Sequence, residues 1–159
     1  MTKIVGSGTL VLAMAMGVCP ARADTVHTTG GADCQSYYDP NSPNGQGIYY
    51  SNGSLSADTF SQYDRFFSCP MQRTNGQSTT GISSVYVDLW DGSNGGMFCV
   101  VNANDEWGNT IASSATEYSN GSEIVFGDIS PSHPWGFYAL LCAMPPGGGN
   151  IYSYQWVER

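Results

Sequence analysis

The stretch "GFYALLCAMPPGGGNIYSYQWVE" (Gly136–Glu158) determines the expected fold. Its two apolar runs, "GFYALLCAM" and "IYSYQWVE", have the composition of β-strands, and "PPGGGN" between them is typical of a turn. In the second run Tyr152, Tyr154 and Trp156 recur at every other position, which is the period that separates the two faces of a strand. The stretch therefore predicts a hairpin that carries a row of aromatic side chains on one face.

The rest of the chain repeats this pattern of short strands and turns. Gly, Ser, Asn and Thr recur about every eight to twelve residues, with apolar or aromatic runs between them, and no segment has a sustained helical period. The sequence predicts an all-β fold, a two-sheet antiparallel sandwich with jelly-roll-like or immunoglobulin-like topology. The further strands expected are Ile82–Trp90, Met97–Ala103 and Glu123–Asp128, with weaker candidates at Gly47–Ser51, Arg65–Arg73 and Thr110–Tyr118.

A second hairpin is expected where "DGSNGG" joins Trp90 to Met97, which would place Asp88 opposite Cys99. Strand alternation then puts Cys99 on one face with Met97, Val101, Tyr86 and Trp90. In the later hairpin the same rule puts Tyr152, Tyr154 and Trp156 on the face of Phe137, Ala139 and Leu141. Because these neighbours are apolar, we expect the aromatic row to be a buried wall of the core. The alternative is an exposed platform that binds a sugar or a flexible polymer by stacking.

The N-terminal residues have the three parts of a secretory signal peptide. Lys3 gives a basic start, "TLVLAMAMGV" gives a short apolar segment, and "ARA" gives small residues before a cleavage site after Ala23. The apolar segment is too short to cross a bilayer, which takes about 20 residues. We therefore expect removal of residues 1–23 and no membrane insertion afterwards. Residues 24–159 would form one secreted or periplasmic domain, with 24–33 as a loose leader.

Four cysteines remain after cleavage, because Cys19 leaves with the signal peptide: Cys34, Cys69, Cys99 and Cys142. An even number of cysteines in an exported chain indicates two disulfides, here a disulfide-stabilised sandwich. The sequence allows three pairings and cannot choose between them. We expect Cys34–Cys69 and Cys99–Cys142, since the latter two lie in the most strand-like segments. Cysteines consumed in this way supply neither a thiol nucleophile nor a zinc site.

The charge of the chain argues against polyanionic partners. The whole sequence has five Lys and Arg residues against thirteen Asp and Glu, and two of the five basic residues lie in the signal peptide. Only Arg65, Arg73 and Arg159 remain. Such a surface repels phosphate backbones and anionic lipid heads, so we expect neither nucleic-acid binding nor membrane-surface binding.

Carboxylates are the one abundant reactive group, since no nucleophile motif or phosphate-binding loop is present. A carboxylate-based glycoside hydrolase needs two of them beside a sugar, and Asp88, Asp91, Asp105 and Glu106 are the candidates near one end of the expected second hairpin. The oxygens of Asp88 and Asp91 are also of the hard kind that calcium accepts. No other cofactor is expected.

The segment "SCPMQR" suggests a further alternative. A disulfide-anchored cysteine followed by proline can stiffen an exposed loop, so Cys69–Arg73 is a candidate inhibitory loop of a small secreted protease inhibitor, with Met71 as the inserted residue. A plain structural interpretation competes with it, in which Pro70 marks the edge or a bulge of a core strand.

The order "FFSCPMQR", "VYVDLWD…MFCVV" and "FYALLCAMPP…IYSYQWVE" resembles a set of uncharacterised exported bacterial proteins that share a Cys-Pro segment and a late Tyr-x-Leu-x-Cys strand. The resemblance spans Cys34–Glu158 and implies an exported, disulfide-bonded, β-rich protein without implying an activity. Together with the shortage of catalytic groups and the surplus of aromatic residues, it leads us to expect a non-catalytic binding or structural module. Its partner would be a glycan or another extracellular protein.

Overall fold

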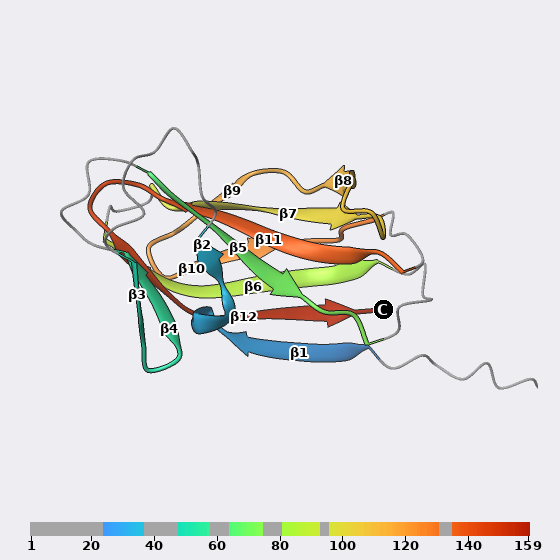
Figure 1. Ribbon diagram of the computed structural model, residues 1–159, viewed down its shortest axis with the longest axis horizontal. Helices are drawn as coiled ribbons and strands as arrows, with labels where there is room; N and C mark the ends of the chain where they lie inside the picture. The colour runs from blue at the N-terminus through green and yellow to red at the C-terminus, as the bar shows by residue number, and fades with distance from the viewer. Residues whose placement is uncertain (1–23, 37–47, 58–63, 75–80, 93–95, 131–134) are drawn as a thin grey trace, which may run out of the picture.

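The computed structural model describes residues 24–36, 48–57, 64–74, 81–92, 96–130 and 135–159, with the backbone alone for 48–51 (Figure 1). The expected signal peptide at residues 1–23 lies outside the described residues. Within the described part of the chain, no helix is long and apolar enough to cross a membrane.

The described strands form two six-stranded antiparallel sheets, which confirms the predicted sandwich (Figure 1). The first, called sheet A, has the order β10 (Glu123–Phe126), β6 (Ile82–Asp91), β12 (Gly149–Glu158), β4 (Ser54–Ala57) and β3 (Ile48–Ser51), with β1 (Thr25–Gly30) beside β12. The second, called sheet B, has the order β2 (Gln35–Ser36), β5 (Arg65–Met71), β11 (Phe137–Met144), β7 (Phe98–Asn104) and β8 (Thr110–Ser113), with β9 (Glu117–Tyr118) beside β7.

Neither of the two expected hairpins exists, because each connection crosses from one sheet to the other. β6 lies in sheet A and β7 in sheet B, while β11 lies in sheet B and β12 in sheet A. Asp88 therefore faces Glu123 and Ser153, and Cys99 faces Cys142. Each strand has one apolar face to bury, and a short connection crosses the roughly 10 Å between packed sheets as readily as it closes a hairpin. This alternation between sheets matches the jelly-roll-like topology.

The expected loose leader is ordered, so that prediction is wrong. Thr25–Gly30 forms β1, which pairs with β12 from Thr25 opposite Glu158 to Gly30 opposite Ser153. The chain then passes through the 3-10 turn η1 (Gly31–Asp33) into sheet B. Gly31 is required there, because a Cβ at this position would lie 1.9 Å from the carbonyl oxygen of Ile151. β1 thereby becomes a structural part of sheet A.

Alternation within each strand separates a buried face from an outer one, although the face of Phe137, Ala139 and Leu141, which the sequence predicts to be covered, is the outer face of β11. β6 buries Val85, Val87 and Leu89, and the facing strands of sheet B bury a matching set: Phe67, Cys69, Met71, Cys99, Val101, Leu140, Cys142 and Met144. Both expected disulfides are present, Cys34–Cys69 and Cys99–Cys142. Cys99–Cys142 joins the neighbouring strands β7 and β11 of sheet B. Cys34–Cys69 joins β5 to the residue directly before its neighbour β2.

A β-bulge in β12 divides the aromatic row. Ile151 lies opposite Leu89 and Ser153 opposite Asp88, so Tyr152 is an additional residue with no partner on β6. An inserted residue reverses which face the following side chains occupy. Tyr154 and Trp156 are therefore buried, at 1% and 3% exposure, while Tyr152 is exposed. The prediction that all three residues share one face is wrong, although two of them do form the wall of the core.

Candidate functional site

Three large aromatic side chains lie on the outer face of sheet A. Tyr86 and Trp90 of β6 are each 47% exposed, and Tyr152 of β12 is 45% exposed. Tyr86 and Trp90 are four residues apart on one strand, or about 13 Å at the usual rise, and the bulge places Tyr152 beside the β6 segment between them. We call this surface, with the polar residues described next, the aromatic face.

Two carboxylates belong to the aromatic face. Asp88 lies between Tyr86 and Trp90 on β6, and Glu123 of β10 is its direct cross-strand partner. A groove of about 380 Å³ runs past both of them and is also lined by Gln155 and Tyr86. The Gln155 Nε2 donates a hydrogen bond of 3.2 Å to the Thr28 Oγ1, which holds this amide in place. The groove thus offers carboxylate and amide oxygens beside exposed rings.

Asp91 has a different role from Asp88. Its side chain is 4% exposed and points into the sandwich, where Oδ2 accepts hydrogen bonds from the Met97 backbone nitrogen at 3.0 Å and the Ser119 Oγ at 2.5 Å. Since Met97 directly precedes β7, this carboxylate ties the end of sheet A to the beginning of the next strand in sheet B. Asp88 and Asp91 lie on opposite sides of β6, so they cannot hold one calcium ion together.

The four candidate carboxylates of a hydrolase do not cluster. Asp105 and Glu106 follow the far end of β7, away from Asp91, and Asp105 accepts hydrogen bonds from the backbone nitrogens of Trp107 and Asn109 at 2.9 and 2.8 Å. It is therefore a turn-forming residue. Among the described residues, no group of three His, Cys, Asp or Glu side chains is placed to hold a metal ion. Asp88 and Asp91, the two calcium candidates, lie on opposite sides of β6, and calcium binding by either one stays a prediction.

The expected inhibitory loop at Cys69–Arg73 is wrong. Cys69 to Met71 belong to β5, which pairs with β11, and Met71 lies opposite Tyr138 with 1% of its surface exposed. A protease cannot reach a side chain that is buried in the core. Pro70 is tolerated because β2 pairs with β5 only at Ser68 and Phe67, and no other described strand pairs with that edge.

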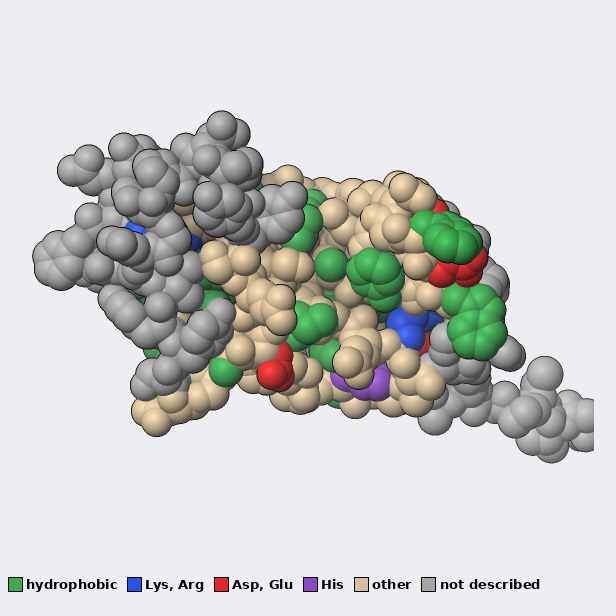
Figure 2. Space-filling model, in the orientation of Figure 1, with side chains coloured by type: hydrophobic (Ala, Val, Ile, Leu, Met, Phe, Trp, Pro, Cys, Tyr) green, Lys and Arg blue, Asp and Glu red, His purple; other side chains and the backbone are tan. Residues whose placement is uncertain are grey.

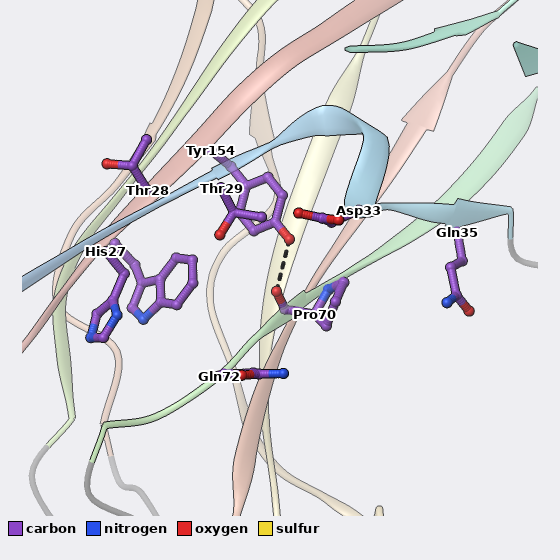
Figure 3. Close-up of a pocket in the computed structure, with 9 residues that line it drawn as sticks. His27, Thr28, Thr29, Asp33, Gln35, Pro70, Gln72 and Tyr154 are labelled. Atoms are coloured by element: carbon purple, nitrogen blue, oxygen red, sulfur yellow. Dashed lines mark hydrogen bonds between the residues drawn. The ribbon is translucent and has the colours of Figure 1, made fainter. Parts of the chain in front are cut away.

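A pocket of about 480 Å³ opens between the two sheets at the edge formed by β1 and β5 (Figure 3). His27, Thr28 and Thr29 of β1 line one side, and Pro70 and Gln72 line the other. Asp33 and Gln35 close one end, while Tyr154 and Trp156 form the floor. Figure 2 shows the corresponding side of the molecule, where polar side chains dominate and histidine reaches the surface. We call it the inter-sheet pocket.

The Tyr154 hydroxyl spans the floor of the inter-sheet pocket. It donates a hydrogen bond of 2.8 Å to the Pro70 carbonyl oxygen, and the Asp33 carboxylate points toward it (Figure 3). Burial raises the pKa of Tyr154 well above its usual range, and the negative charge of Asp33 raises it further, whereas a hydrogen bond with Thr29 acts in the opposite direction. Tyr154 therefore stays neutral and links the two sheets.

A buried polar cluster lies next to the inter-sheet pocket. Glu158, 5% exposed at its side chain, accepts from the Arg73 Nε at 3.3 Å and from the Thr74 backbone nitrogen at 2.9 Å. The His27 Nε2 is 2.8 Å from the Thr74 Oγ1, and its ring stacks on Trp156 with 4.8 Å between ring centroids. Because Arg73 and Thr74 follow β5 whereas Glu158 ends β12, the cluster clamps sheet B to sheet A.

Sheet B carries an outer face of a different kind. Phe66, Phe98, Val100 and Leu141 line a shallow apolar depression of about 320 Å³ on it. Tyr118 packs against Phe98 with 5.6 Å between ring centroids. Polar groups for orienting a ligand are scarce here compared with the aromatic face.

Sequence reasoning missed part of both sites. Alternation did put Tyr86 and Trp90 together, but it assigned them to the face of the buried Cys99, because β6 and β7 were taken for one sheet. His27, Thr28 and Thr29 were missed with the supposed leader, although "TVHTTG" is rich in the β-branched residues that favour strands. Tyr152 stays a predicted ligand contact, and the bulge sets it apart from Tyr154 and Trp156, which are buried.

Comparison with known proteins supports the fold alone. No family model and no curated protein sequence matches the chain. Among solved structures, the chain is similar to a glycosylation-associated protein (Gap123) complex from Streptococcus agalactiae, with a TM-score of 0.55 and 10% identity over 85% of this chain. It spans only 26% of that streptococcal chain.

Two smaller structures are similar over most of their own length. One is the CBM36-1 domain of a multidomain xylanase from the hindgut metagenome of Trinervitermes trinervoides, with a TM-score of 0.46 and 10% identity over 84% of this chain and 96% of that one. The other is CsCBM6-3 from Clostridium stercorarium in complex with cellobiose, with a TM-score of 0.46 and 15% identity over 80% of this chain and 90% of that one.

Proposed function

We propose that this protein is an exported, non-catalytic module that binds a neutral glycan through the aromatic face. The observation that carries the proposal is the grouping of three half-exposed aromatic rings around the Asp88–Glu123 pair on one sheet. Export accords with the two disulfides, which form in oxidising compartments.

The chemistry of the aromatic face fits a carbohydrate. Exposed aromatic side chains that lie close together are typical of sites of interaction, and Tyr and Trp combine an apolar ring with a polar group. The C–H groups of a sugar ring can pack on Tyr86, Trp90 and Tyr152, while its hydroxyls donate to Asp88 and Glu123. Hydrogen bonds to an ionised acceptor are stronger than those between neutral groups. The rings would thus supply affinity and the carboxylates orientation.

The charge of the aromatic face favours a neutral glycan over an acidic one. Two carboxylates line the groove, no described Lys or Arg does so, and the whole chain has a formal charge of −8. A uronate or sulfate group would be repelled there. The open groove also lets a polymer pass across the sheet, because the three rings are spread along β6 and β12 rather than closed around a point.

Affinity electrophoresis and calorimetry with neutral polysaccharides test this proposal, comparing the wild type with Trp90→Ala and Tyr152→Ala. Each variant should bind at least about tenfold more weakly, a factor that corresponds to about 1.4 kcal/mol. Trp107→Ala is the matched control, because Trp107 is 81% exposed in the turn between β7 and β8 of sheet B. Equal losses in all three variants, or no binding by the wild type, would contradict the proposal.

The same samples test hydrolysis as the alternative. Asp88 and Glu123 are direct cross-strand partners, and cleavage of a glycoside needs two carboxylates. Release of reducing ends by the wild type, abolished in Asp88→Asn with the fold retained, would replace the binding module with an enzyme.

A further inference from the structure

We infer that the inter-sheet pocket is a second binding site, separate from the aromatic face, and that it takes one neutral sugar ring, either a monosaccharide or the end of a chain. The two sites draw on opposite faces of β12, since the bulge turns Tyr152 outward and leaves Tyr154 and Trp156 at the floor of the pocket. The inference goes beyond the proposed function, because it does not depend on the aromatic face binding anything.

The inter-sheet pocket has the size and the polarity for such a ligand. Its volume of about 480 Å³ lies within the range of about 300–1,000 Å³ that is usual for small-molecule sites. The hydroxyl of Thr29, the amides of Gln35 and Gln72 and the carboxylate of Asp33 line it (Figure 3). These groups both donate and accept, as a polyhydroxyl ligand requires. A mostly apolar molecule would leave them without partners.

One buried donor of the pocket floor also lacks a partner. The Trp156 indole Nε1 is fully buried and has no hydrogen-bond acceptor among the described residues. An unsatisfied buried donor costs about 1–3 kcal/mol. Because the Trp156 ring forms part of the pocket floor, its indole N–H signal reports on occupancy of the pocket.

The charges around the pocket select against anions. Among the described residues, Asp33 is the only carboxylate in its lining, and no Lys or Arg lines it. The nearest described arginine is directed elsewhere, with the Arg73 Nε on Glu158 at 3.3 Å and its guanidinium 5.7 Å from the centre of the Tyr138 ring. A phosphate or carboxylate ligand would therefore meet a negative charge without a fixed positive one.

The Cys34–Cys69 disulfide holds the two sides of the pocket in register. Asp33 directly precedes Cys34, and Pro70 directly follows Cys69, so the covalent bridge fixes the end of the pocket relative to its β5 side. The hydrogen bond from Tyr154 to the Pro70 carbonyl fixes the floor to the same side. A site that is built before the ligand arrives loses less entropy on binding. This rigidity distinguishes the pocket from a chance gap between sheets.

NMR titration tests the inference, because the chain has only two histidines and four tryptophans. Methyl glycosides of glucose, galactose and mannose are the probes. At least one of them should shift the His27 ring signals and the Trp156 indole N–H signal in a saturable way, and these shifts should persist in Tyr152→Ala. Asp33→Asn and Gln72→Ala should each weaken that binding at least about tenfold. Glu106→Gln, an exposed acid in the β7–β8 turn, should leave it unchanged.

Several outcomes would overturn the inference. His27 and Trp156 signals that no glycoside moves would exclude a sugar site in the pocket. Saturable shifts with ethylammonium and none with the glycosides would make it a cation site instead. Glycoside shifts that appear at Trp90 and vanish in Tyr152→Ala would assign the ligand to the aromatic face alone. Conversely, loss of polysaccharide binding in Trp90→Ala with intact shifts at His27 would leave the pocket standing whatever becomes of the proposed function.

Discussion

The two sheets of the sandwich are stabilised in different ways. Three of the four bridged cysteines lie in strands of sheet B, and the fourth, Cys34, directly precedes its strand β2. The outer face of sheet B carries apolar side chains. Sheet A has no disulfide among its described strands and depends on strand pairing, burial and the Glu158 cluster, and its outer face combines aromatic rings with carboxylates. Covalent constraint and the proposed binding face therefore lie on different sheets, and the inter-sheet pocket lies between them.

The largest effect should come from the disulfides of sheet B. Bridges that close loops of 35 and 43 residues stabilise a chain by about 4 kcal/mol each in the chain-entropy model. Urea unfolding should show that loss in both the Cys34→Ala/Cys69→Ala and the Cys99→Ala/Cys142→Ala variants. Only the first variant should also weaken sugar binding in the inter-sheet pocket. If both variants weaken it equally, the bridge at Cys34 does not organise the pocket.

The next effect should come from the cluster that joins the sheets. Glu158→Gln keeps the shape of the side chain but removes the charge that pairs with the buried Arg73, and breaking a buried ion pair on one side costs about 3 kcal/mol. Thermal and urea unfolding measure the loss. Asp128→Asn is a suitable control, because its 2.8 Å ion pair with Arg159 is half exposed and worth about 0–1 kcal/mol. Equal losses in the two variants would mean that burial of the Glu158 pair contributes nothing.

A smaller and pH-dependent effect is expected at Tyr154. Tyr154→Phe leaves the Pro70 carbonyl without its donor, which should cost about 1 kcal/mol at neutral pH. The raised pKa of Tyr154 means that the unfolded chain releases this proton first, at about pH 10. The contribution of Tyr154 to the free energy of unfolding should therefore be constant below pH 10. Above that pH it should decrease by up to about 1.4 kcal/mol per pH unit. Tyr154→Phe should remove that slope, whereas Tyr86→Phe should retain it.

The smallest effect on stability should come from the aromatic face. Trp90→Ala and Tyr152→Ala change half-exposed side chains, and such surface substitutions usually alter the free energy of unfolding by within about 0.5 kcal/mol. Their larger effect should be on the affinity for the polysaccharide instead. A destabilisation as large as that of Glu158→Gln would show that the rings of sheet A serve packing rather than recognition.

The sequence predicted what each strand does by itself. Alternation separates the two faces of β6 and β11, but in β11 the buried face is that of Leu140 and Cys142, not the expected face of Phe137, Ala139 and Leu141. The expected pairing of the four cysteines is confirmed. These features follow from local periodicity and from the distance that a disulfide permits. The strand β1 is the exception. Its six residues, which are mostly polar or small, bury too little apolar surface to indicate a strand by themselves, and β1 depends on pairing with β12.

What the sequence could not predict is which strands lie beside one another. The segments "DGSNGG" and "PPGGGN" carry turn residues whether they reverse the chain within a sheet or carry it across the core. The bulge is hidden for a related reason: "IYSYQW" alternates perfectly as letters, and only pairing with β6 shows that Tyr152 has no partner. Both errors concern the tertiary context that decides between equally good local patterns.

The unpaired residue of β12 has a consequence for how such a surface can change. Without Tyr152, Ile151 and Ser153 would follow one another on the ladder, and every side chain beyond them would keep its present neighbours. Deletion or insertion of one codon can therefore remove or add one exposed aromatic side chain while the buried core is unchanged. A lineage could vary its ligand preference at this point with little penalty in folding.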